Sequence, residues 1–71
     1  MSLFTLGEEY QAAARALRQR IREIQESADE DLLTETERVL LRRRLSTLIT
    51  MARDASATGR YLKNYYGKED A

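Results

Sequence analysis

The stretch Thr34–Tyr66, TETERVLLRRRLSTLITMARDASATGRYLKNYY, decides the fold because it carries the longest apolar repeat in the chain. Apolar or small residues recur in it in alternating steps of four and three, the spacing of a helix face that packs against another helix. We therefore predict a helix over residues 34–66 with a helical neighbour along its length. The residues expected at this interface, within the hairpin or with a partner chain, are Leu41, Leu45, Leu48, Ala52, Ala55, Gly59, Leu62, Tyr65 and Tyr66.

Both ends of this helix carry local signals. Thr34 and Glu37 fit a capping box, in which the hydroxyl and the carboxylate satisfy backbone N–H groups of the first turn. Gly59 is the one candidate interruption, but the repeat keeps its phase through it, which favours a continuous helix. Gly67 is typical of a residue that ends a helix, and residues 67–71 are expected to form a polar tail.

A second, shorter helix is predicted before the acidic segment of the chain. Thr5 and Glu8 fit another capping box, and apolar residues then recur at helical spacing, so we predict a helix over residues 5–27. Residues 28–33 concentrate negative charge without periodicity and are expected to form a turn. A short connection makes the helices antiparallel neighbours, and the chain is therefore predicted to be one all-α helical hairpin.

The two predicted helices differ in length. At 1.5 Å per residue, residues 34–66 span roughly 50 Å and residues 5–27 roughly 35 Å. Counted back from the turn, the second helix is expected to extend beyond the first from about residues 57–59 to its C-terminal end. We therefore expect a homodimer in which two hairpins form a four-helix bundle and cover these ends. Five large residues off the main stripe, which a single hairpin would leave exposed, support this expectation: Leu40, Ile49, Met51, Tyr61 and Tyr65.

Composition argues against most chemistry. The 71 residues contain no His, Cys or Pro, so the commonest general base, the usual zinc ligands and disulfides are excluded. We predict that the protein is not an enzyme, with no catalytic or metal-binding residues, no cofactor and no small-molecule substrate. Twelve basic residues balance twelve acidic ones, and no run is long and apolar enough to span a membrane. We expect a cytoplasmic protein without a membrane partner.

Arginines are the strongest local charge feature. Five of them could form a basic belt around the middle of the hairpin that contacts nucleic acid: Arg18, Arg22, Arg42, Arg43 and Arg44. Consecutive helical residues point about 100° apart, however, so three adjacent arginines spread around the helix, and nearby glutamates could pair with several of them. A solvated, salt-bridged surface is therefore the preferred interpretation, and nucleic-acid binding is the alternative.

The tyrosines near the C-terminus allow two interpretations. Tyr65 and Tyr66 could close the end of a dimer core, or Tyr61 and its neighbours could stack on a base beside Arg60 and Lys63. We favour the first. Tyrosines left on the surface would mark a site for another protein.

Two resemblances accompany these patterns. In its length, its predicted hairpin and its acidic turn, Ser27 to Asp31, the chain resembles the Rop-like RNA-binding regulators of plasmids, which dimerise into four-helix bundles. The segment RRRLSTLITMARDASATGRYLKNYY resembles the C-terminal half of small helical proteins from Firmicutes prophages and mobile elements, a resemblance that implies no activity. The leading hypothesis is a self-associating protein-interaction module whose further partner is another helical protein. The alternative is a nucleic-acid-binding regulator that uses the arginines.

Overall fold

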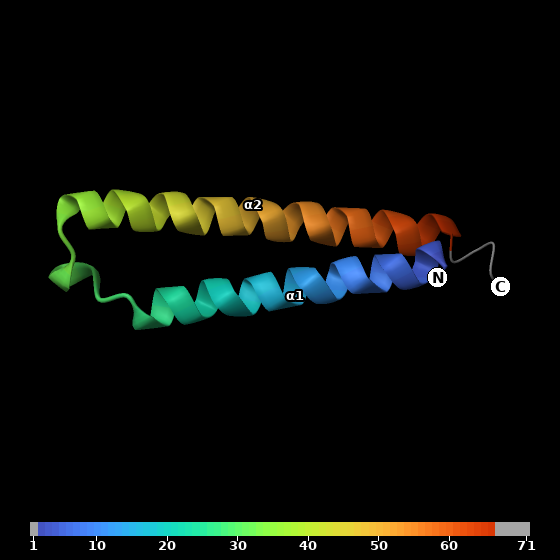
Figure 1. The fold of residues 1–71 in the computed structure, drawn as a ribbon, viewed down its shortest axis with the longest axis horizontal. Coiled ribbons are helices and arrows are strands. Elements are labelled where there is room, and N and C mark those ends of the chain that lie inside the picture. The colour runs from blue at the N-terminus through green and yellow to red at the C-terminus, as the bar shows by residue number, and fades with distance from the viewer. Residues whose placement is uncertain (1, 67–71) are drawn as a thin grey trace.

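The computed structural model describes residues 2–66, the side chain of Glu30 excepted, as two antiparallel α-helices (Figure 1). Helix α1 spans Leu3–Ser27, and helix α2 spans Glu35–Tyr66. A 3-10 turn, η1 (Glu30–Leu32), lies between them. These residues contain no strand, and the molecule is a rod with extents of 54 × 16 × 15 Å. The predicted all-α hairpin is confirmed, whereas the predicted tail, residues 67–71, lies outside the described residues.

The start of α2 agrees with its predicted capping box. The backbone N–H of Glu37 donates to Thr34 Oγ1 at 3.2 Å, and the backbone N–H of Thr34 donates to Glu37 Oε1 at 3.1 Å. The hydrogen bond from the backbone N–H of Thr34 lowers the pKa of the Glu37 carboxyl, and the Thr34 side chain lowers it further. Two of the N–H groups that a helix start leaves without intrahelical partners are thereby satisfied.

The start of α1 differs from the prediction. Ser2, not Thr5, is the N-cap, and its Oγ accepts from the backbone N–H of Thr5 at 3.0 Å. The predicted box of Thr5 and Glu8 is wrong because Ser2 offers the same acceptor three residues earlier. The additional turn also places Phe4 against α2, where Lys63 Nζ lies 5.5 Å from the centre of its ring.

The connection between the helices is longer than a tight turn. Asp29 accepts two hydrogen bonds within residues 28–34. The backbone N–H of Leu32 donates to the carbonyl of Asp29 at 3.1 Å, and the backbone N–H of Asp31 donates to the carboxylate of Asp29 at 3.2 Å. The chain thus advances along the rod before α2 begins (Figure 1). Leu33 turns back toward the helices and is half-buried.

The predicted C-terminal overhang is wrong. Gly7 near the start of α1 packs against Gly59, and the N-terminus lies beside the last turns of α2 (Figure 1). The surplus length of α2, 32 residues against 25, lies instead at the end of the connection. The prediction counted both helices back from a turn at residues 28–33, whereas residues 28–34 carry the chain outward before it returns (Figure 1). Helix α2 is continuous through Gly59, as its unbroken repeat predicts.

Small residues form the centre of the contact between α1 and α2. The buried residues recur every seven positions: Gly7, Ala14 and Ile21 on α1, Ala52 and Gly59 on α2. Because glycine and alanine carry little side-chain volume, the helices approach closely but bury little apolar area. Within residues 2–66, three hydrophobic residues are buried, and two of these are alanines.

Candidate interaction surfaces

The hairpin has two long sides, one on each flank of the line where the helices meet. In a helix, residues one and four positions before a buried residue lie on one flank, and residues one and four positions after it lie on the other. Because the helices are antiparallel, corresponding residues of α1 and α2 share a flank. A groove lined by Arg18 and Arg22 from α1 and by Ile49 and Arg53 from α2 agrees with this arrangement. Each of the three arginines follows a buried residue by one or four positions, and Ile49 lies one turn before Arg53.

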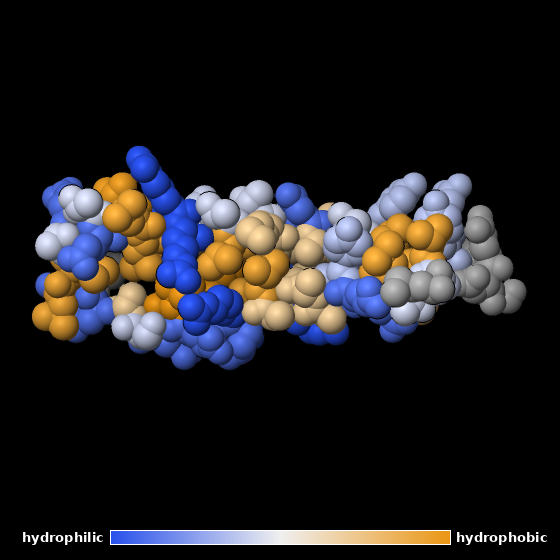
Figure 2. Space-filling model, in the orientation of Figure 1, coloured by the Kyte–Doolittle hydropathy of each residue, from blue (hydrophilic) through white to orange (hydrophobic). Residues whose placement is uncertain are grey.

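One flank, which we call the apolar side, is built from residues that precede the contact positions. Its members are Leu3, Leu6, Tyr10, Ala13, Leu17 and Ile24 on α1, and Leu41, Leu48, Met51, Ala55, Leu62 and Tyr65 on α2. Figure 2 shows this side, where hydrophobic atoms gather in patches along the rod with hydrophilic side chains between them. Leu3, Tyr10, Met51 and Tyr65 remain more than a third exposed. The apolar stripe of each helix is therefore wider than its neighbour covers.

Near the connection, the apolar side contains a groove of about 420 Å³. Leu33 and Leu40 line it together with Ile24 and Leu41, and Arg20 and Arg44 also contribute. At this end of the rod, the first turns of α2 extend beyond the C-terminal end of α1. The groove thus widens the apolar surface with residues from three parts of the chain.

The residues predicted to form an interface differ in their exposure. Eight of them are buried or half-buried within the single hairpin: Leu41, Leu45, Leu48, Ala52, Ala55, Gly59, Leu62 and Tyr66. Tyr65 stays exposed. The five residues expected to be left exposed by a single hairpin, Leu40, Ile49, Met51, Tyr61 and Tyr65, are indeed between 36% and 61% exposed. Sequence reasoning missed the contribution of α1, where Leu6, Tyr10 and Ala13 line a further shallow groove with Glu9.

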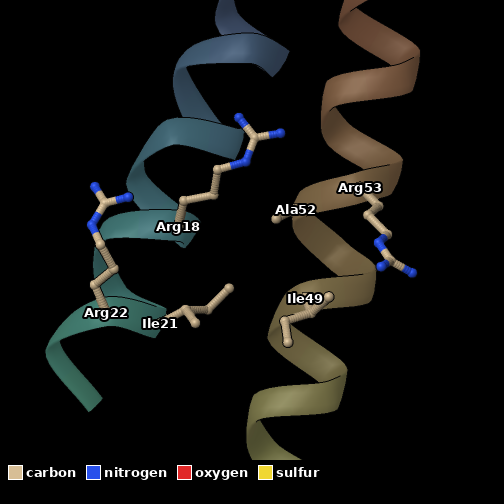
Figure 3. Close-up of a pocket in the computed structure, with 6 residues that line it drawn as sticks. All are labelled: Arg18, Ile21, Arg22, Ile49, Ala52 and Arg53. Carbon is tan, nitrogen blue, oxygen red and sulfur yellow. The ribbon is translucent and has the colours of Figure 1, made fainter. Parts of the chain in front are cut away.

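The opposite flank, which we call the basic side, carries a groove of about 380 Å³ (Figure 3). Figure 3 looks at the side of the molecule opposite to that of Figures 1 and 2, since α2 there runs upward to the right of α1. The side chains of Ile21, Ile49 and Ala52 lie between the helices. Arg22 lies at the outer edge of α1, and Arg53 lies at the outer edge of α2. A small apolar floor is thus bordered by guanidinium groups.

The predicted arginine belt is divided among several faces. Arg18 and Arg22 lie on the basic side, and Arg42 shares that side because it precedes Ile49 by seven residues. Arg44 lies in the groove of the apolar side, and Arg43, one residue away, points outward. A belt also requires Arg18 and Arg22 to lie level with residues 42–44, which the structure does not show. The register places Arg53 beside Arg18 and Arg22, because the connection shifts α2 along the rod.

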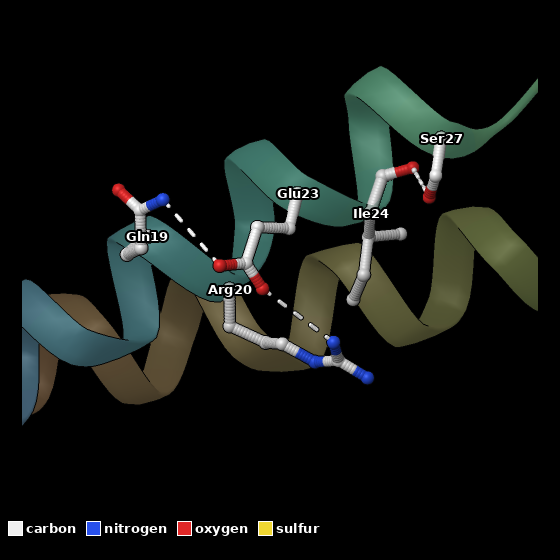
Figure 4. A network of polar contacts seen from close by, with 5 residues as sticks. All are labelled: Gln19, Arg20, Glu23, Ile24 and Ser27. Atoms are coloured by element: carbon white, nitrogen blue, oxygen red, sulfur yellow. Dashed lines mark hydrogen bonds and ion pairs between the residues drawn. The ribbon is translucent and has the colours of Figure 1, made fainter.

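Polar contacts on α1 are local and exposed (Figure 4). Arg20 Nη1 lies 3.6 Å from Glu23 Oε2, and Gln19 Nε2 donates to Glu23 Oε1 at 3.4 Å. Arg22 Nη2 donates to Gln19 Oε1 at 2.8 Å, and Ser27 Oγ donates to the carbonyl of Ile24 at 3.3 Å. Exposed contacts of this kind contribute only a few tenths of a kcal/mol each. These contacts make the exposed surface of α1 polar, and they do not form a binding site.

The tyrosines form a ladder at the end of α2. The rings of Tyr61 and Tyr65 are stacked, with centroids 5.7 Å apart, and Tyr66 meets Tyr65 edge to face at 4.8 Å. Tyr66 is half-buried against α1, whereas Tyr61 and Tyr65 are exposed beside Arg60 and Asn64. The aromatic rings thus continue from the helix contact to the outer surface.

The described residues hold neither a metal site nor a membrane span. Within residues 2–66, no group of three or more Asp, Glu, His or Cys side chains is arranged to hold a metal ion. No helix in this part of the chain is long and apolar enough to cross a membrane. The two sides of the hairpin and the tyrosine ladder are therefore the features on which a functional interpretation can be built.

Comparisons with known proteins identify no relative. No family model, curated protein or solved structure matches the chain. Its function must therefore be inferred from its own surfaces.

Proposed function

We propose that the chain is a non-catalytic protein-interaction module that self-associates through its apolar side into a homodimeric four-helix bundle. The observation that carries this proposal is the small core of a single hairpin. Ala14, Ile21 and Ala52 are its buried hydrophobic residues, whereas nine large hydrophobic residues in the described part of the chain are exposed. A domain of this size needs additional buried area to offset the conformational entropy that it loses on folding.

The accessible surface supports the same proposal. The chain exposes 5498 Å², whereas a compact protein of 8.2 kDa exposes about 4,500 Å². The excess, about 1,000 Å², is comparable to the roughly 800 Å² that each partner contributes to a standard protein interface. One pairing of hairpins would therefore bring the exposed surface per chain to that of an ordinary globular protein.

The apolar side is favoured over the basic side for this pairing because of its charge. Packing two basic sides together would bring like charges into contact, which costs free energy that apolar contacts must first offset. The apolar side carries Leu, Met and Tyr along most of the rod, with Arg20 and Arg44 near the connection. Tyr61, which lies toward the outer face of α2, would stay accessible to a further helical protein.

Light scattering after size-exclusion chromatography tests the proposal. At micromolar concentration we expect a mass of twice 8.2 kDa and a melting temperature that rises with protein concentration. A mass of 8.2 kDa across this range, with a cooperative melt that does not depend on concentration, would contradict it.

A further inference from the structure

The basic side carries a line of arginines that the self-association leaves unused. Its members are Arg15, Arg18 and Arg22 on α1, and Arg42, Arg53 and Arg60 on α2. We infer that this line, which we call the arginine strip, binds the phosphate backbone of a nucleic acid. The proposal differs from the predicted belt because it follows the length of the rod instead of encircling its middle.

Carboxylates are missing from the chain segments that form the centre of the strip. The segment Arg15–Arg22 contains no Asp or Glu, and the segment Ile49–Arg60 contains only Asp54. Asp54 follows the buried Ala52 by two residues, which places it about 200° from the helix contact and away from the strip. The balanced net charge of the chain therefore hides a local excess of positive charge.

The strip arginines are free to meet an anion. All six are exposed, and among the described residues none of them forms an ion pair within 4 Å. Arg22 makes a side-chain contact, a hydrogen bond to the neutral amide of Gln19. By contrast, Arg20 on the other flank is paired with Glu23. The guanidinium groups of the strip therefore keep their full charge, and apart from the one Nη2 donor that Arg22 gives to Gln19 their N–H groups can meet a phosphate.

The spacing of the strip suits a linear polyanion. With Arg53 level with Arg18, the helical rise places the arginines at successive levels roughly 5–11 Å apart over about 27 Å of the rod. Phosphates of a nucleic-acid backbone form a comparable row, and guanidinium groups bind them through paired N–H donors. The floor of the groove offers Ile21, Ile49 and Ala52, which supply no hydrogen bonds for reading bases. Binding is therefore expected to be insensitive to sequence.

Self-association and the strip are compatible but independent. Two hairpins joined through their apolar sides would display one strip on each outer face. Each strip belongs to a single chain, so it is complete without the partner. A failure of nucleic-acid binding can thus be distinguished from a failure of dimerisation by measuring both on one sample.

Fluorescence anisotropy with labelled duplexes of mixed sequence and about 20 base pairs, one of DNA and one of RNA, tests the proposal. Six phosphate contacts predict a loss of affinity of about 10³-fold between 50 and 200 mM salt. Arg18→Gln with Arg53→Gln should weaken binding at 50 mM salt by roughly 100-fold and lower the salt slope by about 1.8. Arg15→Gln with Arg60→Gln, at the other end of the strip, should have a similar effect.

The matched control removes the same charge from other faces, as Arg20→Gln with Arg43→Gln, and should change the affinity less than about threefold. Circular dichroism confirms that each exposed substitution leaves the helices intact. Absence of binding to both duplexes at low salt, about 50 mM, overturns the proposal. An equal loss in the control also overturns it, because net charge alone would then account for binding. Equal affinity for a polyglutamate peptide of the same charge would do so too, by pointing to an acidic protein partner.

Discussion

The two regions of the helix contact are built on different principles. Where Gly7 meets Gly59, a Cβ added at Gly59 would lie 2.7 Å from the carbonyl oxygen of Gly7, so the backbones themselves are in contact. Around Ile21 the side chains instead separate the helices, and a groove of about 380 Å³ remains beside them. In the first region the backbones are too close to leave space between them, whereas in the second the side chains fill only part of the space between the helices.

This difference shows which part of the helix contact is incompletely packed. The glycine region has no room for more atoms, while the region toward the connection has grooves on both flanks. A second chain can therefore add packing to the wide region but cannot come between the helices in the narrow one. The substitutions below test the contrast in order of expected effect.

Filling the narrow region should cost the most. Gly59→Val places its side chain against Gln11 Cγ and the backbone carbonyl of Gly7, and this carbonyl cannot move without parting the helices. We expect the free energy of unfolding to fall by about 3 kcal/mol, measured by urea denaturation at fixed protein concentration. Ala57→Val, at an exposed position of the same helix, should cost less than about 1 kcal/mol. Equal effects of the two substitutions would contradict the close approach.

Emptying the wide region should cost less. Ile21→Ala removes the largest buried side chain at the contact, but the adjacent groove is already open to solvent. The loss in unfolding free energy should be about 2 kcal/mol, the low end of the range for such truncations. A loss near the upper end, about 5 kcal/mol, in the same urea titration would show that this region is as tightly packed as a closed core.

The cap of α2 should matter less than either. Thr34→Ala removes the oxygen that accepts from the backbone N–H of Glu37, and we expect a loss of about 1 kcal/mol. Thr36→Ala, two residues later and also exposed, serves as the matched substitution and should change the melting temperature little. If both variants melt alike, the capping box contributes no stability.

The smallest effect concerns pH. Because the backbone hydrogen bond to Thr34 lowers the pKa of Glu37 in the folded state, its stabilisation is fully present above the ordinary pKa of glutamate. It should be lost as the pH falls through that value toward the lowered pKa. Melting curves from about pH 7 to about pH 3 should therefore show a smaller decline for Glu37→Gln than for the unmodified chain. Parallel declines would indicate that Glu37 titrates identically in both states.

Periodicity was sufficient to predict the secondary structure. The steps of three and four placed both helices, and the capping box at Thr34 is present in the structure. The register was not predictable in the same way, because it depends on how far residues 28–34 travel. Apolar spacing does not record that distance, so the overhang was assigned to the wrong end of α2.

The division of the surface into two sides required the register and the identity of the contact positions. Once Gly7, Ala14 and Ile21 are known to face Ala52 and Gly59, the flank of every other residue follows from helical geometry. From the sequence alone, Arg42, Arg43 and Arg44 drew attention because they are adjacent. Arg53, which lies with Arg18 and Arg22, is isolated in the sequence and went unnoticed.

Sedimentation equilibrium of two variants tests the central claim, that copies of the chain pair through the apolar side, most directly. Met51 and Ile49 are two residues apart on α2, exposed to 49% and 36%, and lie on opposite flanks. We predict that Met51→Glu sediments as a monomer of 8.2 kDa at concentrations where Ile49→Glu and the unmodified chain remain dimers. A dimer for Met51→Glu, or dissociation by Ile49→Glu alone, would contradict the account.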